Sequence, residues 1–434
     1  MVESVERTPV AGRWGGILPN PTGEHAQSSR LRLLTLSTVY PNPDQPGKGR
    51  FVHERIRHMA SGADITVLAP VPVFDYQRRH KTKRGVPDTQ DGRLSILRPR
   101  WIYPPLIGGI NPLWLFLRLI WPMRQLRRSF RYQVIDSHFG FPDGCAAALL
   151  AWLFRCPFTV TLRGSEVLHG KYPVRRFGMR VALRRADRVI AVSERLRQFA
   201  ISLGVKPEHV KTIPNGVDTT RFFVRDQTES RRQHGIPLDR KMILSAGHLI
   251  ELKGHHRIIQ ALSGIRNQGT DAELVIAGGG GDVKSFEQEI HRTVSDCGLQ
   301  QHVRFMGEVP QQTLAELMAA ADVFCLASSR EGWPNVVNES LACGLPVVAT
   351  DVGAIPEMIA SGQNGIVVPP GDVPALEGAL EEALHRDWDR AAIATWGQSR
   401  SWEQVAKDVL HEMDLILTEN GLRDPVSQSS APIH

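Results

Sequence analysis

The sequence predicts an α/β protein built from two doubly wound domains. Short apolar segments alternate with helical segments along most of the 434 residues, and such alternation is typical of a parallel sheet covered on both faces. A polar stretch at residues 216–240 interrupts the alternation once. A chain of this length is also too long for one ordinary core. We therefore expect two domains facing across a cleft, with ligands at the carboxyl ends of their strands.

Charge divides the chain at the same place. Residues 1–215 hold 34 Lys and Arg against 15 Asp and Glu, hence +19; residues 216–434 hold 18 against 30, hence −12, and the sum is the net +7. Such asymmetry indicates different partners for the two domains. A basic domain suits nucleic acid, an anionic membrane surface or an anionic acceptor. We predict no nucleic acid, because the sequence has no aromatic-basic reading module.

The cysteines and the apolar runs indicate in which cellular compartment the protein is expected. The five cysteines are scattered without a CxxC pair, which argues for buried thiols in a reducing cytoplasm and against a zinc site or disulfide framework. The N-terminal stretch lacks a signal-peptide core, and the longest apolar run, at 145–154, is too short to span a bilayer. We predict a cytoplasmic protein and leave open a peripheral position on the inner face of the plasma membrane.

The N-terminal domain is expected at residues 29–215, after a disordered leader at 1–28. Its first strand, at 31–36, leads through a Pro- and Gly-rich loop into a helix at 51–60. A long helix is expected at 112–131. The other strands are short apolar runs at 64–68, 94–97, 134–136, 158–161, 189–192 and 210–213.

The C-terminal domain is expected at residues 241–400, after a linker at 216–240. A helix at 401–420 is expected to return to the N-terminal domain, and the polar tail at 421–434 is expected to be flexible. A further helix is predicted at 373–385. The strands of this domain are expected at 241–245, 273–277, 303–305, 323–326, 347–350 and 366–368.

Two carboxylates flank a predicted helix start in the second domain. Glu331 lies in a loop, and the helix opens at Pro334, because proline is tolerated where the first N–H has no partner. Gly344 suits the residue that ends this helix. Glu339 then lies about 12 Å further along the axis. The N–H groups between the two glutamates favour an anion, which suits a sugar nucleotide.

Glycine-containing loops follow the first strand of each domain. The first is Gly47-Lys-Gly-Arg50, and the second runs from Gly247 and His248 to Lys253. Glycines let backbone N–H groups approach a phosphate or a sugar, and Lys253 is a plausible partner for a diphosphate. The spacing matches neither a Walker loop nor a dinucleotide fingerprint, so a plain flexible loop and a solvated lysine remain the alternatives.

Two polar residues end neighbouring strands of the first domain. His138 and Arg163 are expected at strand ends that face the cleft; a packed histidine is the alternative. Asp387-Trp-Asp389 is interpreted as a solvated pair. We find no other cluster with metal-ligand spacing and no nucleophile triad, and therefore predict no metal site.

The helix at 112–131 mixes Trp and Leu with five arginines. This composition is typical of an interfacial helix near anionic lipid headgroups, and the basic loop at 78–84 agrees with it. A core-facing helix with a basic outer face is the alternative, and both stay open. The candidate membrane or acceptor contacts are Trp114, Trp121, Arg124, Arg127 and Arg128.

These residues resemble a retaining glycosyltransferase of family 4, with the GT-B fold of two Rossmann-like domains, over about residues 31–417. The most specific sign is Glu331 and Glu339, seven residues apart, before Ser-Leu-Ala-Cys-Gly-Leu-Pro-Val-Val-Ala-Thr. The N-terminal domain resembles enzymes that build exopolysaccharide, cell-wall polymer or lipid-linked sugars. Supporting signs are Ile213-Pro-Asn-Gly-Val-Asp218, Lys253-Gly254, Phe305-Met-Gly307, Asp351-Val-Gly-Ala-Ile-Pro-Glu357 and Phe141-Pro-Asp-Gly.

The resemblance implies an acceptor-binding N-terminal domain and a nucleotide-sugar-binding C-terminal domain, with the following roles on the donor side. Glu331 would contact the donor sugar near the reacting carbon, Glu339 the ribose hydroxyls, and Lys253 the diphosphate. Backbone N–H groups from Gly332 through Asn335 to Val336 would hold sugar and phosphate.

His138 would lie near the donor sugar. An arginine usually stands where this chain has His248, and a histidine is only partly charged at neutral pH. Lys253, Arg163 or Arg330 would then supply the charge.

The resemblance also implies a reaction. We expect a metal-independent, retaining hexosyltransferase without a cofactor, which moves a sugar from a UDP- or GDP-sugar to a hydroxyl of a lipid-linked or polysaccharide acceptor. The enzyme alternatives are a GT-B nucleotide-sugar epimerase and a phosphorylase. The alternative without catalysis is a membrane-bound scaffold with a degenerate site.

Overall fold

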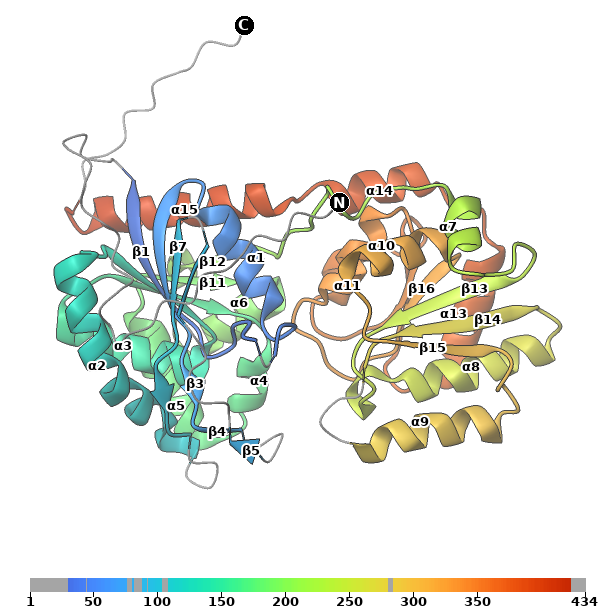
Figure 1. Cartoon of the computed structure of the whole chain (residues 1–434), viewed down its shortest axis with the longest axis horizontal. Coiled ribbons are helices and arrows are strands. Elements are labelled where there is room, and N and C mark those ends of the chain that lie inside the picture. The colour runs from blue at the N-terminus through green and yellow to red at the C-terminus, as the bar shows by residue number, and fades with distance from the viewer. Residues whose placement is uncertain are drawn as a thin grey trace, which may run out of the picture. The chain divides into compact units, whose positions relative to one another are not determined.

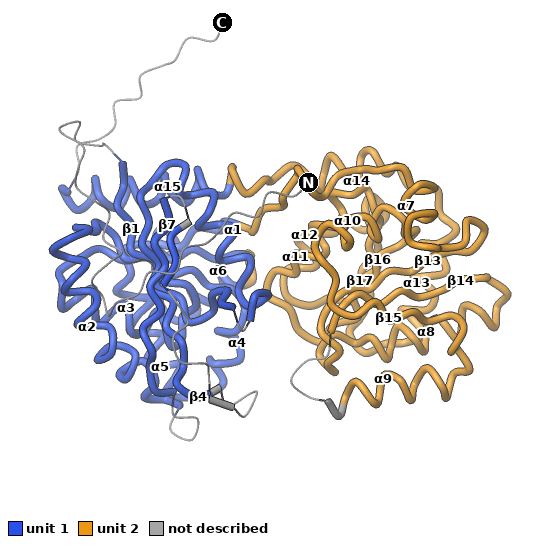
Figure 2. Tube along the Cα trace, in the orientation of Figure 1, with its two compact units in different colours: residues 1–192, 196–213, 405–434 blue, residues 193–195, 214–404 orange. Residues whose placement is uncertain are grey.

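The computed structural model divides into two compact units, which are described separately (Figure 2). Unit 1 comprises residues 1–192, 196–213 and 405–434, and unit 2 comprises residues 193–195 and 214–404. The expected leader at 1–28, most of the basic loop at 78–84 and the tail from 423 lie outside the described residues. The structure describes residues 30–43, 45–75, 80–81, 88–91, 93–103, 108–279 and 284–422.

Unit 1 is built on an eight-stranded sheet in the order β12-β11-β10-β9-β1-β2-β7-β6 (Figure 1). All neighbours pair parallel except β6 and β7. The two short pairs β3–β8 and β4–β5 lie outside this sheet. The strands of the main sheet are β1 (Leu31–Leu36), β2 (Ala63–Leu68), β6 (Thr89–Asp91), β7 (Leu94–Leu97), β9 (Val134–His138), β10 (Phe158–Leu162), β11 (Arg188–Ala191) and β12 (Val210–Thr212).

Helices pack against this sheet. The C-terminal helix α15 (Trp402–Glu419) is tied to β11 by ion pairs from Arg188 to Glu412 at 2.8 Å and to Glu419 at 3.0 Å. Its residues from Val405 onward therefore belong to unit 1. The other helices are α1 (Arg50–Met59), α2 (Asn111–Ser129), α3 (Cys145–Phe154), α4 (Ser165–His169), α5 (Pro173–Arg185) and α6 (Glu194–Ser202).

Unit 2 is built on a six-stranded parallel sheet in the order β15-β14-β13-β16-β17-β18. From β13 the chain adds β14 and β15 on one side, and from β16 it adds β17 and β18 on the other. The strand order therefore reverses between β13 and β16, which is the topological switch point of the sheet. The strands are β13 (Lys241–Ala246), β14 (Ala272–Ala277), β15 (Val303–Gly307), β16 (Val323–Leu326), β17 (Val347–Thr350) and β18 (Gly365–Val368).

Apolar side chains of unit 2 alternate between two cores, one on each face of the sheet. Met242 and Leu244 of β13 point into one core, and Ile243 between them points into the other. This alternation follows from the period of two residues in a strand. Helices on both faces complete the layers: α7 (Gln227–Gln233), α8 (His255–Asn267), α9 (Lys284–Asp296), α10 (Gln311–Ala320), α11 (Asn335–Ala342), α12 (Ile355–Met358), α13 (Val373–His385) and α14 (Arg390–Gln398).

The stretch expected to be a linker contains ordered structure. Helix α7 lies within residues 216–240 and begins after Asp226, whose side chain accepts from the Glu229 N–H. The Arg231 side chain is buried and donates to Asp322 at 2.7 Å. The polar composition of this stretch is typical of a linker. The sequence does not show that Arg231 is held against the rest of unit 2 by Ala320 and Asp322, about ninety positions away.

Candidate active site

The loops that follow β13 and β16 lie at the switch point of the unit 2 sheet. Ile243 of β13 pairs with Val323 of β16, so the two loops start from neighbouring strands. The first carries Lys253, and the second carries Glu331. Parallel α/β sheets bind their ligands at this position, beyond the carboxyl ends of the strands.

Lys253 and Glu331 form an ion pair between these loops. The Nζ of Lys253 lies 2.7 Å from Oε1 of Glu331, and their side chains are 19% and 11% exposed. The Ser328 hydroxyl donates to the same oxygen at 2.7 Å. The buried Thr350 hydroxyl in turn donates to the Ser328 carbonyl at 2.5 Å. The Ser328 hydroxyl therefore holds Glu331 directly and Thr350 holds the backbone of Ser328, while the ion pair keeps access to solvent.

Two glycines allow the loops to approach this closely. Gly254 has φ +72°, and a Cβ there would lie 2.0 Å from the Ala327 carbonyl oxygen. Gly353 has φ +57°, and a Cβ there would lie 2.3 Å from the carbonyl oxygen of Glu331. A side chain at either position would push the backbone of the loops apart.

Helix α11 begins directly after the Glu331 loop, at Asn335. The prediction of a helix here is confirmed, with Pro334 in the preceding cap position and Gly344 in the left-handed conformation after its end. No side chain caps the amino end, so backbone N–H groups of the first turn face outward along the axis. Glu339, one turn further, is half-buried.

Unit 2 contains most of the residues that were predicted on the donor side, whereas Gly47, His138 and Arg163 belong to unit 1. His248 and Arg330 are exposed, and Asn335 accepts from the Asn215 amide at 2.9 Å. Their roles in donor binding stay predictions. The residues that lie on the two loops and on α11 are Gly247, His248, Lys253, Arg330, Glu331, Gly332, Asn335, Val336 and Glu339.

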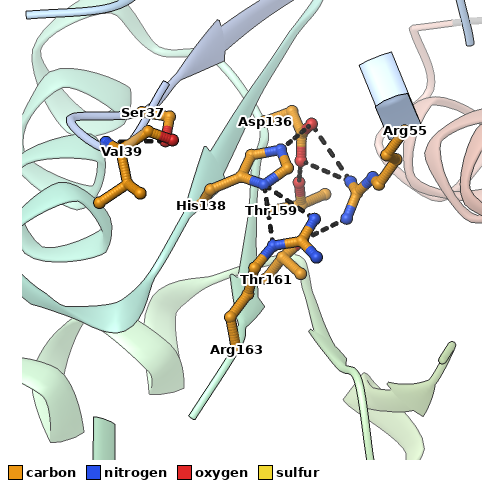
Figure 3. A network of polar contacts seen from close by, with 8 residues as sticks. All are labelled: Ser37, Val39, Arg55, Asp136, His138, Thr159, Thr161 and Arg163. Carbon is orange, nitrogen blue, oxygen red and sulfur yellow. Dashed lines mark hydrogen bonds and ion pairs between the residues drawn. The ribbon is translucent and has the colours of Figure 1, made fainter. Parts of the chain in front are cut away.

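Unit 1 contains a buried polar network around Asp136 (Figure 3). The Arg55 guanidinium donates to both oxygens of Asp136, at 3.1 and 3.2 Å, and to Thr161 at 2.7 Å. Thr159 donates to Asp136 at 2.9 Å. Burial alone would raise the pKa of Asp136, but Arg55 and His138 outweigh it and hold this pKa below its usual range. Asp136 is thus a carboxylate surrounded by donors.

His138 lies between Asp136 and Arg163 in the same network. Its Nε2 lies 3.2 Å from Asp136 and donates to it, and its Nδ1 accepts from the Arg163 Nη2 at 3.0 Å. Burial lowers the pKa of His138 to about 3; Asp136 opposes this shift, and Arg163 and Arg55 add to it. The ring is therefore neutral at pH 7, with its proton on Nε2. Its predicted place near the donor sugar stays a prediction.

A second buried carboxylate, Glu166, holds the turn after β10. It accepts from the backbone N–H groups of Gly140 at 2.9 Å, Arg163 at 3.1 Å and Gly164 at 2.7 Å. These bonds join the ends of β9 and β10 and orient the backbone of Arg163. The sequence places Glu166 directly after a strand end, but nothing local shows that three N–H groups converge on it.

Two family models match the chain. The model described as "Glycosyltransferase Family 4" matches residues 47–221, and the model described as "Glycosyl transferases group 1" matches residues 226–400. The chain belongs to the family 4 glycosyltransferases. The two matches together include the residues of the unit 1 network and of the unit 2 ion pair.

Similar proteins agree with this family 4 assignment. TuaC of Bacillus subtilis, a glycosyltransferase assigned to teichuronic acid biosynthesis, is 29% identical over 84% of this chain and 92% of its own. A GDP-mannose-dependent alpha-(1-6)-phosphatidylinositol monomannoside mannosyltransferase of Mycolicibacterium smegmatis is 33% identical over 55% and 63%. The crystal structure of Anabaena HepE with UDP matches with TM-score 0.67 and 19% identity over 89% and 100%. The predicted α/β fold with two Rossmann-like domains is confirmed.

The first glycine loop of this glycosyltransferase differs in detail from the prediction. Gly47 is exposed, and a Cβ there would meet no atom within 4 Å. The backbone constraint falls on Gly49, which has φ +67° and whose Cβ would lie 2.2 Å from the Val39 carbonyl oxygen. Donor binding by Gly47 stays a prediction.

The predicted membrane residues lie on α2. Trp114 and Trp121 are exposed, as are Arg124 and Arg128. Arg127 donates to the Tyr132 carbonyl at 2.6 Å and lies over the Tyr132 ring, so it also holds the end of the helix. Among the described residues, no helix is both long and apolar enough to cross a membrane.

Proposed function

We propose that this glycosyltransferase moves a hexose-type sugar from a UDP- or GDP-sugar to a hydroxyl of a lipid-linked or glycan acceptor, with retention of configuration and without a metal. The observation that carries the proposal is the Lys253–Glu331 pair at the switch point, at 2.7 Å, next to the uncapped amino end of α11. One cation and a helix N-terminus suit a diphosphate, and a nearby carboxylate suits sugar hydroxyls.

The pair also explains how the donor would be recognised. Without ligand, each charge has the other as its partner. A bound diphosphate offers Lys253 a stronger partner and leaves Glu331 to accept from sugar hydroxyls. Because Ser328 holds Glu331 through a separate bond of 2.7 Å, the carboxylate keeps its place when Lys253 changes partner. Glu339 on α11 is then in a position suited to the ribose hydroxyls.

The same groups would lower the barrier to transfer. When the bond from the sugar to the diphosphate breaks, negative charge grows on the leaving phosphate. A fixed ammonium group and preoriented N–H groups stabilise that charge without reorganisation, which is the task that a divalent cation performs in other transferases. The acceptor hydroxyl would attack from the face that the phosphate leaves, and its proton would pass to that phosphate. Retention follows from this route.

Names of similar proteins support both donor bases. HepE was solved with UDP, and the mannosyltransferase is named for GDP-mannose. The names of TuaC and the mannosyltransferase refer to teichuronic acid and to phosphatidylinositol monomannoside, which supports a lipid-linked or glycan acceptor here.

A thermal-shift panel of UDP, GDP and their sugar conjugates tests the proposal. A ligand at about 100 times its Kd adds about 2.7 kcal/mol to the free energy of unfolding, so one base should raise the melting temperature clearly. Lys253→Ala should abolish the shift. Lys241→Ala is the matched control. Lys241 is the first residue of β13, at the end of this strand opposite to the loop that carries Lys253. If no nucleotide shifts the melting temperature, the scaffold alternative is favoured.

Product analysis separates the enzyme alternatives. The protein is incubated with the stabilising sugar nucleotide without an acceptor, and the products are followed by NMR. A transferase gives slow hydrolysis to nucleotide and free sugar with the original anomeric configuration. An epimerised sugar nucleotide would overturn the proposal in favour of the epimerase, and a sugar phosphate formed with inorganic phosphate would favour the phosphorylase. Adding EDTA should leave the hydrolysis rate unchanged if no metal takes part.

A further inference from the structure

Three helices of unit 1 present apolar side chains to solvent in one layer. Helix α3 packs against both α2 and α5 (Figure 1). Their inward faces already supply the core, through residues such as Leu115, Leu150 and Leu183. The outward apolar residues therefore lie outside the core. We name them the Trp–Phe face, which consists of Trp114, Trp121, Trp152, Leu153, Val174 and Phe177.

The side chains of the Trp–Phe face are largely exposed to solvent. Trp152 is 71% exposed, Phe177 68%, Val174 65% and Trp121 63%. Single exposed apolar residues are ordinary, but clusters on neighbouring elements mark an interaction surface. From the sequence we predicted only the two tryptophans of α2, because the apolar residues of α3 and α5 come close to them only in the folded unit.

The charge of the same helices has one sign. Helices α2, α3 and α5 contain nine arginines and no aspartate or glutamate. On α5, Arg176, Arg180 and Arg184 recur at every fourth residue, so they form one stripe beside Val174 and Phe177. An apolar face edged by arginines is complementary to lipid chains beneath anionic headgroups.

We propose that the Trp–Phe face docks this protein on an anionic lipid bilayer. Tryptophan rings are suited to the headgroup level, and arginines reach the lipid phosphates from there. A second copy fits poorly, because a symmetric contact would bring the same arginines of both copies together. A soluble polyanion would cover the arginines but leave Val174 and Phe177 in water. Docking would place the enzyme where a lipid-linked acceptor is found.

The test is flotation of the full-length protein with vesicles, in the absence of donor. We expect binding to phosphatidylcholine vesicles that contain phosphatidylglycerol and little binding to phosphatidylcholine alone. Tryptophan emission should shift to the blue on binding, and higher salt should weaken the binding. Inorganic phosphate at the same ionic strength should compete no better than chloride. Stronger competition by phosphate would show a phosphate site and overturn the proposal.

Variants separate the apolar and charged contributions. The triple variant Trp121→Ala, Trp152→Ala, Phe177→Ala and the double variant Arg176→Gln, Arg180→Gln should each bind anionic vesicles about tenfold more weakly. The matched controls are Trp396→Ala and Arg292→Gln, which remove an exposed tryptophan and an exposed arginine from unit 2. They should bind as the parent does.

Two results would refute the proposal. One is vesicle binding by the triple variant that equals that of the parent. The other is a dimer in sedimentation velocity that the triple variant loses, because a second copy would then cover the face. Since the changed side chains are exposed, thermal melting should show that all variants fold as the parent does. Nucleotide binding is measured separately on the same samples, so failure of vesicle docking is distinguishable from failure of the proposed transfer reaction.

Discussion

The two units hold their charges in different ways. In unit 1, Asp136 and His138 are fully buried, and Arg55 is 2% exposed. Each of these three side chains has hydrogen-bond partners inside the unit (Figure 3). In unit 2, Lys253 and Glu331 are paired but keep 19% and 11% exposure. A sealed network cannot exchange partners without unfolding, whereas a partly exposed pair can. We therefore interpret the first as a scaffold and the second as a ligand site.

The largest expected effect comes from breaking the sealed network. Asp136→Ala leaves the Arg55 guanidinium buried without its carboxylate, and removing one partner of a buried pair costs about 3–5 kcal/mol. The free energy of unfolding, measured in urea, should fall by this amount. Asp414→Ala on α15 is the control, since its carboxylate belongs to unit 1 but lies outside the network. An unchanged midpoint in Asp136→Ala would mean that the network contributes little to stability.

The partly exposed pair should behave in the opposite way. Glu331→Gln keeps the shape but removes the charge, and we expect transfer or donor hydrolysis to slow by about 100-fold or more, because electrostatic groups at the reacting centre commonly carry such factors. The side chains of the pair are 19% and 11% exposed, so solvent screens part of the interaction, and the urea midpoint should fall by less than in Asp136→Ala. A large loss of stability with full activity would reverse the roles that we assign to the two units.

Ser328 tests whether Glu331 must be held in place. Ser328→Ala removes the 2.7 Å bond to Oε1, and we expect about a tenfold lower kcat with little change in KM, because misplacement costs catalysis more than binding. Thr350→Val, which removes the bonds to the carbonyls of Ser328 and Leu326 but none to Glu331 itself, should have a smaller effect in the same direction. A rise in KM at constant kcat would instead show that Ser328 supports donor binding.

The smallest effect is expected from Asp143, a buried carboxylate of unit 1 that accepts from the Thr38 N–H and hydroxyl. Burial raises its pKa to about 7, although Thr38 and Lys48 oppose the shift. The folded protein then keeps a proton that the unfolded chain, with a pKa near 3.8, has lost. Stability from this group is full below pH 4 and falls as the pH rises toward 7.

Asp143→Asn removes this dependence. Relative to the parent, the variant should gain about 1 kcal/mol or more between pH 5 and pH 8, measured by thermal melting in matched buffers. His138 has the opposite sign: its pKa near 3 means that the folded state resists protonation, so its contribution is lost as the pH falls below 6.5. A difference between parent and variant that stays constant with pH would show that Asp143 does not titrate in this range.

Prediction from sequence was strongest where the signal is local. The expected helix at 373–385 coincides with α13, and the motif from Glu331 to Glu339 forms the predicted loop and helix. It was weakest where polar residues are buried. Asp136 lies inside a strand that was identified by its apolar neighbours, and nothing near it in the chain indicates Arg55. Helix α7 was missed for the same reason, because Arg231 anchors it to the distant residues Ala320 and Asp322.

The sequence by itself determined the alternation of strands and helices, the two carboxylates of α11 and its loop, and the family. These features depend on spacings of a few residues, because the periods of helices and strands are short and determined by the local backbone geometry. The tertiary structure decided which charges meet: Arg55 and Asp136 are 81 positions apart, and Lys253 and Glu331 are 78 apart. It also decided which tryptophans face solvent. Strand order and helix packing bring such residues together, and no short pattern encodes which strands become neighbours.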